Sequence, residues 1–151
     1  NPSIMNIINS EIYNQIKEVH KFPMGDLFFF ENMIITQVNE GEHVSFNSTK
    51  LPFKCIYDYY EALKKPFGII SNRLNKYSLE VLDLPKYSKN LPNLKFYGVV
   101  GNTNFNNVNI SLEKQFSKIP VLDFDNISEA YNTINDYILN STNDSVTFDI
   151  P

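Results

Sequence analysis

Apolar residues along this chain fall into short continuous runs that alternate with segments of helical periodicity. Residues 27–30 and 33–38 are β-rich runs on either side of Glu31-Asn32, and this pattern predicts a hairpin. A helix over residues 49–64 should follow, because its apolar positions share one helical face. These positions are Leu51, Cys55, Ile56, Tyr59 and Leu63.

The run at residues 67–70 is short, apolar on both faces and preceded by the helix-breaking Pro66. This pattern is typical of a central parallel strand, so we expect the run to be paired on both sides and nearly fully buried. The alternation then continues to a last helix, which Asp125-Asn126 caps and which has a clear apolar stripe from Ile127 onward. The segments between are a weak helix over 79–87, a strand over 95–100, a helix marked by Val108, Leu112 and Phe116, and a strand over 120–124.

The two ends of the chain give weaker signals. Isoleucines at four-residue spacing favour a short helix within residues 1–18, although residues 16–22 could equally begin a strand. We treat residues 1–15 as an N-terminal extension. Residues 141–151 are polar and are expected to form a flexible tail or a late edge strand.

This order of elements predicts a single α/β domain over residues 1–151. Strands linked by helices require a parallel core with right-handed crossovers, and the hairpin adds an antiparallel edge. We expect a mixed sheet of about four to five strands with about four helices packed on it.

Composition indicates a globular protein rather than a disordered, membrane-spanning or polyanion-binding one. The chain is 42% hydrophobic, has a net charge of −4 and scatters its lysines, so nucleic acid is not an expected partner. No apolar run approaches the roughly 20 residues that cross a bilayer, and we expect a cytoplasmic protein without stable membrane insertion. The lone Cys55 allows no intrachain disulfide and is expected to be buried and unreactive.

Arg73 is the only arginine beside twelve lysines, and it follows the predicted strand at residues 67–70. Ligands and partners tend to bind where the carboxyl ends of buried parallel strands meet. A guanidinium holds a carboxylate or phosphate through two hydrogen bonds. We therefore expect an at least partly accessible Arg73 to grip an anionic group, with hydrogen bonds donated by Ser71, Asn72 and Ser78.

Tyr77 would stack on this loop or cap it. In the competing interpretation, Arg73 is a structural strut that is salt-bridged to a helix carboxylate such as Glu80 and closed to ligands.

The order of elements is similar to that of the STAS domain, and more closely to the stand-alone SpoIIAA-like proteins of bacteria, over roughly residues 16–140. Asn39-Glu40-Gly41 resembles the loop between the second strand and the first helix of these domains. Ile70-Ser71-Asn72-Arg73 lies where they carry the loop after the third strand, although Ser71-Asn72-Arg73-Leu74 replaces the Asp-Ser-Ser/Thr-Gly of the antagonists. The resemblance implies a SpoIIAA-like sandwich and a binding or regulatory module that acts through this loop, bordered by Glu40 and Gly41.

Three classes of function stay open. The leading expectation is a non-enzymatic module that binds a protein partner or a small anionic ligand. An internal apolar pocket would instead favour a carrier of a small or lipid-like ligand. Its expected lining is Phe28, Phe30, Ile56 and Tyr59. A hydrolase, finally, would need a histidine or an acid within hydrogen-bond reach of Ser71 or Ser78.

Few other residues suggest chemistry. His43 with Glu40 and Glu42 is the only local cluster of metal-ligand types, and the dispersed glycines form no phosphate loop, so we expect no metal and no cofactor. In the run 28–30 the strand alternation should turn at least one phenylalanine to the opposite face of the sheet. An exposed ring there would offer a surface for a homodimer or a ligand.

Overall fold

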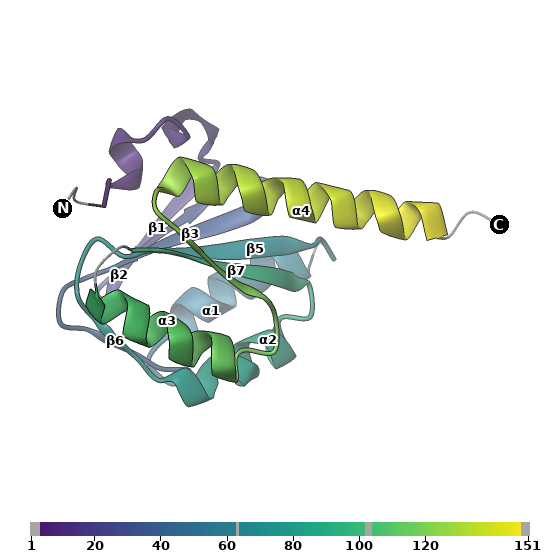
Figure 1. Cartoon of the computed structure of the whole chain (residues 1–151). Coiled ribbons are helices and arrows are strands. Elements are labelled where there is room, and N and C mark those ends of the chain that lie inside the picture. The colour runs from purple at the N-terminus through teal and green to yellow at the C-terminus, as the bar shows by residue number, and fades with distance from the viewer. Residues whose placement is uncertain (1–3, 63, 102–103, 149–151) are drawn as a thin grey trace.

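A mixed six-stranded sheet carries the structure (Figure 1). The structure, a computed structural model, describes residues 4–62, 64–101 and 104–148, with side chains throughout except at 104–109 and 142–148. In their order across the sheet, the strands are β1 (Glu18–Phe22), β2 (Gly25–Phe29), β3 (Met33–Val38), β5 (Phe67–Asn72), β7 (Leu94–Val100) and β8 (Val121–Phe124). The pairs β1–β2 and β2–β3 are antiparallel, whereas β3, β5, β7 and β8 run parallel to one another.

Helices cover both faces of this sheet. They are α1 (Lys50–Ile56), which continues as a π-helical turn (Tyr57–Glu61), α2 (Leu84–Asn90), α3 (Asn104–Phe116) and α4 (Ile127–Phe148). Figure 1 shows α4 across one face beside the N-terminal segment, whose 3₁₀ turns are Ile7–Asn9 and Tyr13–Gln15, and α1, α2 and α3 on the other face. The predicted α/β fold with a parallel core, an N-terminal hairpin and four helices is confirmed.

The strand predictions hold in the centre of the sheet and fall short at its edge. β2 and β3 form the predicted hairpin, and β5 pairs with β3 and β7 and is buried except for a half-buried Ile69. The sheet has six strands rather than four to five, because β1 adds an edge strand. β1 is mostly exposed, so it lacks the continuous apolar run by which a buried strand is recognised.

A second, smaller sheet joins two loops of the sequence. It pairs β4 (His43–Val44) with β6 (Ser78–Leu79) in parallel. Backbone hydrogen bonds extend the pairing, since Gly41 N donates to the Lys76 carbonyl at 2.8 Å and Ser78 N donates to the Glu42 carbonyl at 2.9 Å. Periodicity could not predict this ladder, because strands of two residues have no period.

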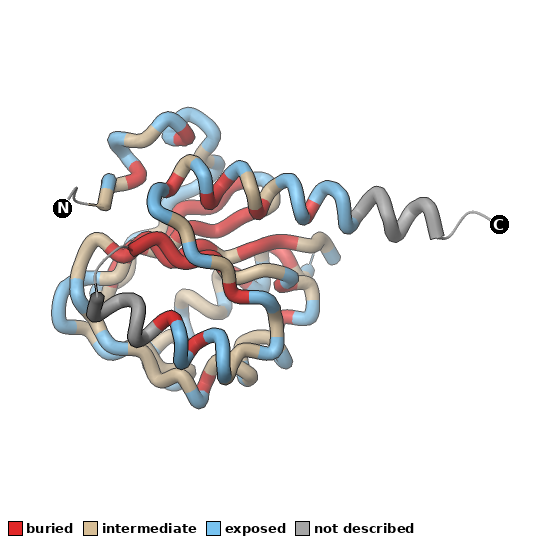
Figure 2. Tube along the Cα trace, viewed as in Figure 1, coloured by how far each residue is buried: buried red, intermediate tan, exposed pale blue. Residues whose placement is uncertain are grey.

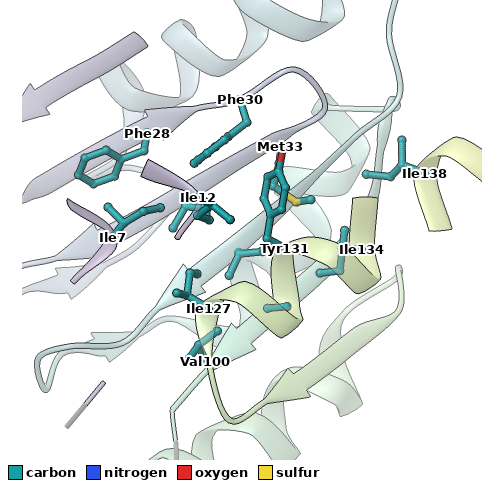
Figure 3. Close-up of a cluster of buried hydrophobic side chains, with 13 residues drawn as sticks. Ile7, Ile12, Phe28, Phe30, Met33, Val100, Ile127, Tyr131, Ile134 and Ile138 are labelled. Atoms are coloured by element: carbon teal, nitrogen blue, oxygen red, sulfur yellow. The ribbon is translucent and has the colours of Figure 1, made fainter. Parts of the chain in front are cut away.

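An apolar cluster fills the space between α4 and the face of the sheet that it covers (Figure 3). Ile134 and Ile138 enter it from α4, and Ile7 and Ile12 enter it from the N-terminal segment. All four side chains are at most 3% exposed. Ile7 and Ile12 thus anchor the N-terminal segment to the core, although most residues of that segment are exposed.

Two glycines set how closely α4 approaches the sheet. A methyl group placed on Gly68 of β5 would stand 2.8 Å from Ile134 Cγ2, and one placed on Gly98 of β7 would stand 2.5 Å from Ile134 Cδ1. Carbon atoms in contact normally lie about 3.5–4.0 Å apart. The helix can therefore lie at this distance only because both positions lack a side chain.

Tyr60 occupies the centre of the opposite face, beneath α1. Its ring stacks on Phe67 with centroids 4.4 Å apart, and its hydroxyl donates to the carbonyls of Phe30 at 2.5 Å and Met33 at 2.8 Å. Burial raises the pKa of Tyr60 well above its ordinary value of 10, so the hydroxyl remains a donor near neutral pH. Tyr60 thereby ties the α1 layer to the turn of the β2–β3 hairpin.

We expect Tyr60→Phe to lower the free energy of unfolding by about 1–2 kcal/mol, because the Phe30 and Met33 carbonyls lose the one hydroxyl hydrogen that they share while the ring packing is kept. Urea denaturation measures this change. The neighbouring Tyr59→Phe, made at a partly exposed ring, serves as the control. Equal losses in the two variants would show that the hydroxyl of Tyr60 does not stabilise the hairpin.

No phenylalanine of the run 28–30 is exposed, so the alternative of an exposed ring in this run is wrong. Phe28 and Phe30 lie in the cluster under α4, and Phe29 lies in the cluster under α1. All three residues are buried, and Figure 2 shows in red how buried residues run along the strands of the sheet. The alternation along the strand was predicted correctly, but helices cover both faces, so the run offers no surface to a second copy.

Three local expectations are also corrected. Leu51 is 68% exposed instead of facing inward, although Ile56 of the same helix is buried. Residues 141–148, expected as a tail or edge strand, continue α4 to Phe148. Cys55 is half-buried against the cluster under α1, while its low reactivity stays a prediction. Leu63 and residues 149–151 lie outside the described residues.

Candidate functional site

Arg73 lies at the carboxyl end of β5, as predicted, but its side chain is buried. Only 4% of that side chain is exposed, and the carboxylate that pairs with it, Glu113 of α3, is fully buried. The expected accessible guanidinium is therefore wrong. The competing interpretation of a strut is the better one, with Glu113 in the place proposed for Glu80.

Hydroxyl groups bind this ion pair on the side of Glu113 Oε1, whereas Glu113 Oε2 is buried without a hydrogen-bond partner among the described residues. Arg73 Nη2 donates to Glu113 Oε1 and, at 3.0 Å, to the hydroxyl of Tyr97, which in turn donates to Glu113 Oε1 at 2.9 Å. Arg73 Nε donates to Ser71 Oγ at 3.1 Å, and the hydroxyls of Ser71 and Tyr77 lie 2.5 Å apart. The guanidinium carbon also lies 5.7 Å from the centre of the Tyr77 ring, within the range of a cation–π contact.

The surroundings of the network keep the Arg73 guanidinium charged and the Tyr97 hydroxyl neutral. Burial alone would lower the pKa of Arg73, but the surrounding Tyr97, Tyr77 and Glu113 raise it on balance, so the guanidinium stays protonated. Burial and then the charge of Glu113 raise the pKa of Tyr97 well above 10, so its hydroxyl stays a donor. Such an arrangement holds β5, β7 and α3 together and leaves the guanidinium no room for an external anion.

Asn72 belongs to a different network on the opposite face of the sheet. Its Nδ2 donates to Gln37 Oε1 and to the Met5 carbonyl, each at 2.9 Å. Gln37 Oε1 also accepts a hydrogen bond from Ile7 N at 2.8 Å. Asn72 therefore fastens the N-terminal segment to the sheet, and strand alternation explains why it points away from Ser71 and Arg73.

Glu40 and Gly41 do come together with the segment of Ser78, next to the small β4–β6 sheet. Glu40 Oε2 accepts a hydrogen bond from Lys76 N at 2.8 Å, and Gly41 N donates to the Lys76 carbonyl. The neighbourhood predicted for the two loops is thus correct. These hydrogen bonds hold the two loops to each other. The guanidinium of Arg73 is buried, so the loops do not form a joint binding site with it.

Ser78 also meets the distance requirement set for a hydrolase, since its Oγ lies 2.7 Å from His43 Nδ1. Val44 and Leu79 line the pocket described next, so alternation along the ladder puts His43 and Ser78 on its opposite side. In the described part of the chain, His43 donates no hydrogen bond to a carboxylate that would orient it. We therefore base no catalytic proposal on this pair.

An apolar pocket lies on the same face of the sheet as Arg73, between the strands and the α1–α2 layer. Its cavity has a volume of about 150 Å³. The floor includes Leu27, Thr36 and Ile69, with Val38 at the end of β3. The helical side is formed by residues of α1 and α2, among them Phe53, Ile56, Tyr87 and Leu91. Of the four residues expected to line a carrier pocket, only Ile56 does so.

Tyr97 connects the pocket with the ion pair. Its ring lines the cavity while its hydroxyl binds Arg73 and Glu113. Other hydroxyls around the pocket, Thr36 excepted, are engaged in a similar way: those of Thr49 and Tyr87 lie 2.5 Å apart, and Ser88 Oγ donates to the Pro85 carbonyl at 3.2 Å. The wall therefore presents mainly carbon atoms to an occupant.

Sequence reasoning missed Glu113 and, apart from Ile56, the residues that line the pocket. The predicted stripe of α3 included Leu112, which is 40% exposed, whereas Ile110 and Glu113 are buried. An acidic residue on the inner face violates the apolar pattern, so the phase of the helix was assigned wrongly. The one signal available was the lone arginine beside a buried strand, since a buried guanidinium requires a carboxylate.

Within the described residues, no group of three or more His, Cys, Asp or Glu side chains could hold a metal ion. The helices of that same part of the chain include none that is both long enough and apolar enough to cross a membrane. Comparison with protein-family models, curated proteins and solved structures finds no match for this chain. The resemblance to the STAS and SpoIIAA-like domains stays a prediction.

Proposed function

We propose that this protein is a non-enzymatic binding protein whose site is the apolar pocket between the sheet and the α1–α2 layer, and whose ligand is a small apolar molecule. The observation that carries the proposal is the cavity of about 150 Å³ among inward-facing hydrophobic side chains. The carrier hypothesis thus replaces binding of an anion by Arg73, because that side chain is engaged by Glu113.

The pocket walls support this proposal through their incomplete burial. Phe53, Ile69 and Leu84 point into the interior yet are only half-buried, because the cavity leaves part of their surface uncovered. Each Å² of apolar surface removed from water is worth roughly 25 cal/mol, so a ligand that covers these walls gains affinity. Pockets lined by apolar and aromatic side chains are the usual sites for small molecules.

Xenon tests whether the pocket is open to an apolar occupant, because xenon enters apolar cavities of this volume without requiring any hydrogen bond. Amide chemical shifts recorded under xenon pressure should move for residues around the pocket, such as Leu27 and Ile69. In Val38→Phe the larger ring should fill the cavity and abolish these shifts, while the melting temperature is kept or raised.

Val19→Phe is the matched control, since Val19 lies on the edge strand β1, is 46% exposed and does not line the pocket. This variant should respond to xenon as the unsubstituted protein does. A cavity that xenon does not enter, or an identical response in Val38→Phe, would contradict the proposed function.

A further inference from the structure

We infer that the pocket is selective for a neutral molecule about the size of one aromatic ring that carries a single hydrogen-bonding group, and that Thr36 makes the polar contact. Phenol is the simplest member of this class. The inference rests on the proposed function and adds to it the class of ligand and a specificity-determining residue.

Size sets the first limit. A cavity of 150 Å³ has the volume of the engineered cavity that accepts benzene or xenon. Pockets for drug-sized ligands are larger, about 300–1,000 Å³. A long acyl chain would have to leave most of its length outside the cavity, whereas a single ring can be enclosed.

Charge sets the second limit. Asp26 is the one ionisable acid or base, tyrosines aside, among the described residues that line the pocket. It alternates along β2 with Gly25 and Leu27, and Leu27 belongs to the cluster on the pocket side. The Asp26 carboxylate therefore points to the other face of the sheet. A charged ligand would lose its hydration without gaining a counter-charge, which is costly.

Hydrogen-bonding capacity sets the third limit. The hydroxyls of Thr49 and Tyr87 bind each other, Ser117 Oγ donates to the Ile119 carbonyl at 2.7 Å, and Tyr97 is held by the ion pair. Thr36 is the exception: among the described residues no partner binds its hydroxyl.

Because of its position on β3, the side chain of Thr36 points toward the pocket. It pairs across the strands with Leu27 and lies two residues from both Ile34 and Val38, so all four share one face of the sheet. Leu27 and Ile34 belong to the cluster on the pocket side, and Val38 lines the cavity. One unengaged hydroxyl on an apolar wall fits a ligand with one polar group.

The test measures dissociation constants for phenol, toluene and benzoate by amide chemical-shift titration. The unsubstituted protein is compared with the Thr36→Val variant. Valine has the shape of threonine but lacks the hydroxyl. One hydrogen bond is worth about 0.5–1.5 kcal/mol, so Thr36→Val should weaken phenol binding roughly two- to tenfold. Toluene should bind the variant at least as well as the original protein, and benzoate should bind more weakly than phenol by about tenfold or more.

The possible outcomes separate this inference from the proposed function. Equal effects of Thr36→Val on phenol and toluene would overturn the role of Thr36. Binding of dodecanoate or benzoate in preference to phenol would overturn the ligand class, although the pocket would still be a binding site. Failure of xenon and of every probe to shift the pocket amides would overturn the proposed function itself.

Discussion

Replacing Glu113 by alanine is expected to lower the free energy of unfolding by about 3–5 kcal/mol. The substitution leaves the guanidinium of Arg73 buried without its counter-charge, and it deprives the Tyr97 hydroxyl of an acceptor. An unpaired buried charge is among the costliest defects a fold can contain. Urea or thermal denaturation of the purified variant measures the loss.

Lys114→Ala is the matched control, because Lys114 neighbours Glu113 in α3 and pairs with Asp123 on the surface. Both members of that pair are about half exposed, so its removal should cost at most about 1 kcal/mol. If Glu113→Ala were no more damaging than Lys114→Ala, the ion pair at Arg73 would not be the strut that we describe.

A double variant separates the charge from the packing. Arg73→Met combined with Glu113→Leu removes both charges and keeps apolar volume in their place, so it should be clearly more stable than Glu113→Ala alone. The strut then predicts strong coupling between the two positions in a double-mutant cycle. Additive effects of the two substitutions would contradict direct pairing.

Alanine at Gly68 or Gly98 is the second substitution expected to have a large effect, with a loss of about 1–3 kcal/mol at each position. Either methyl group would enter the space of Ile134, which is fully buried beneath α4. Helix and sheet would have to separate, or Ile134 would have to leave its rotamer. Thermal denaturation followed by circular dichroism measures the loss.

The two glycines meet different atoms of Ile134, and this difference provides an internal control. Ile134→Val removes Cδ1, the atom nearest to the site of a methyl group on Gly98, and retains Cγ2, the atom nearest at Gly68. Gly98→Ala should therefore cost less in the Ile134→Val background, while the cost of Gly68→Ala should hardly change. Rescue of both variants, or of neither, would contradict the packing described here.

Much of the sheet could be predicted because its signals are local. Residues 27–38 carry two β-rich runs beside a turn, and 67–70 is apolar on both faces, so hairpin and central strand follow from side-chain chemistry. The last helix was recognised for the same reason, since its stripe includes the buried Ile127, Ile134 and Ile138. For edge strand β1 the signal left helix and strand both open, and the two-residue strands β4 and β6 have no such signal.

The candidate site could be predicted only in part. That Arg73 follows a buried strand, and that the loop of Glu40 and Gly41 lies beside that of Ser78, came from the order of elements. Whether Arg73 faces solvent depended on α3, which brings Glu113 over the end of β5. No local pattern encodes that meeting, because the two residues are 40 positions apart in the chain.

By itself, then, the sequence determined the central strands, most of the helices and their order, because periodicity and turn residues act over a few neighbouring positions. Only the tertiary structure decided that Arg73 is a strut and that an apolar pocket lies beside it. A buried ion pair and a cavity both depend on how helices from distant parts of the chain meet the sheet. The free energy of burying a charge or of leaving a space empty depends on how several segments pack together, so it cannot be predicted from the sequence of one segment.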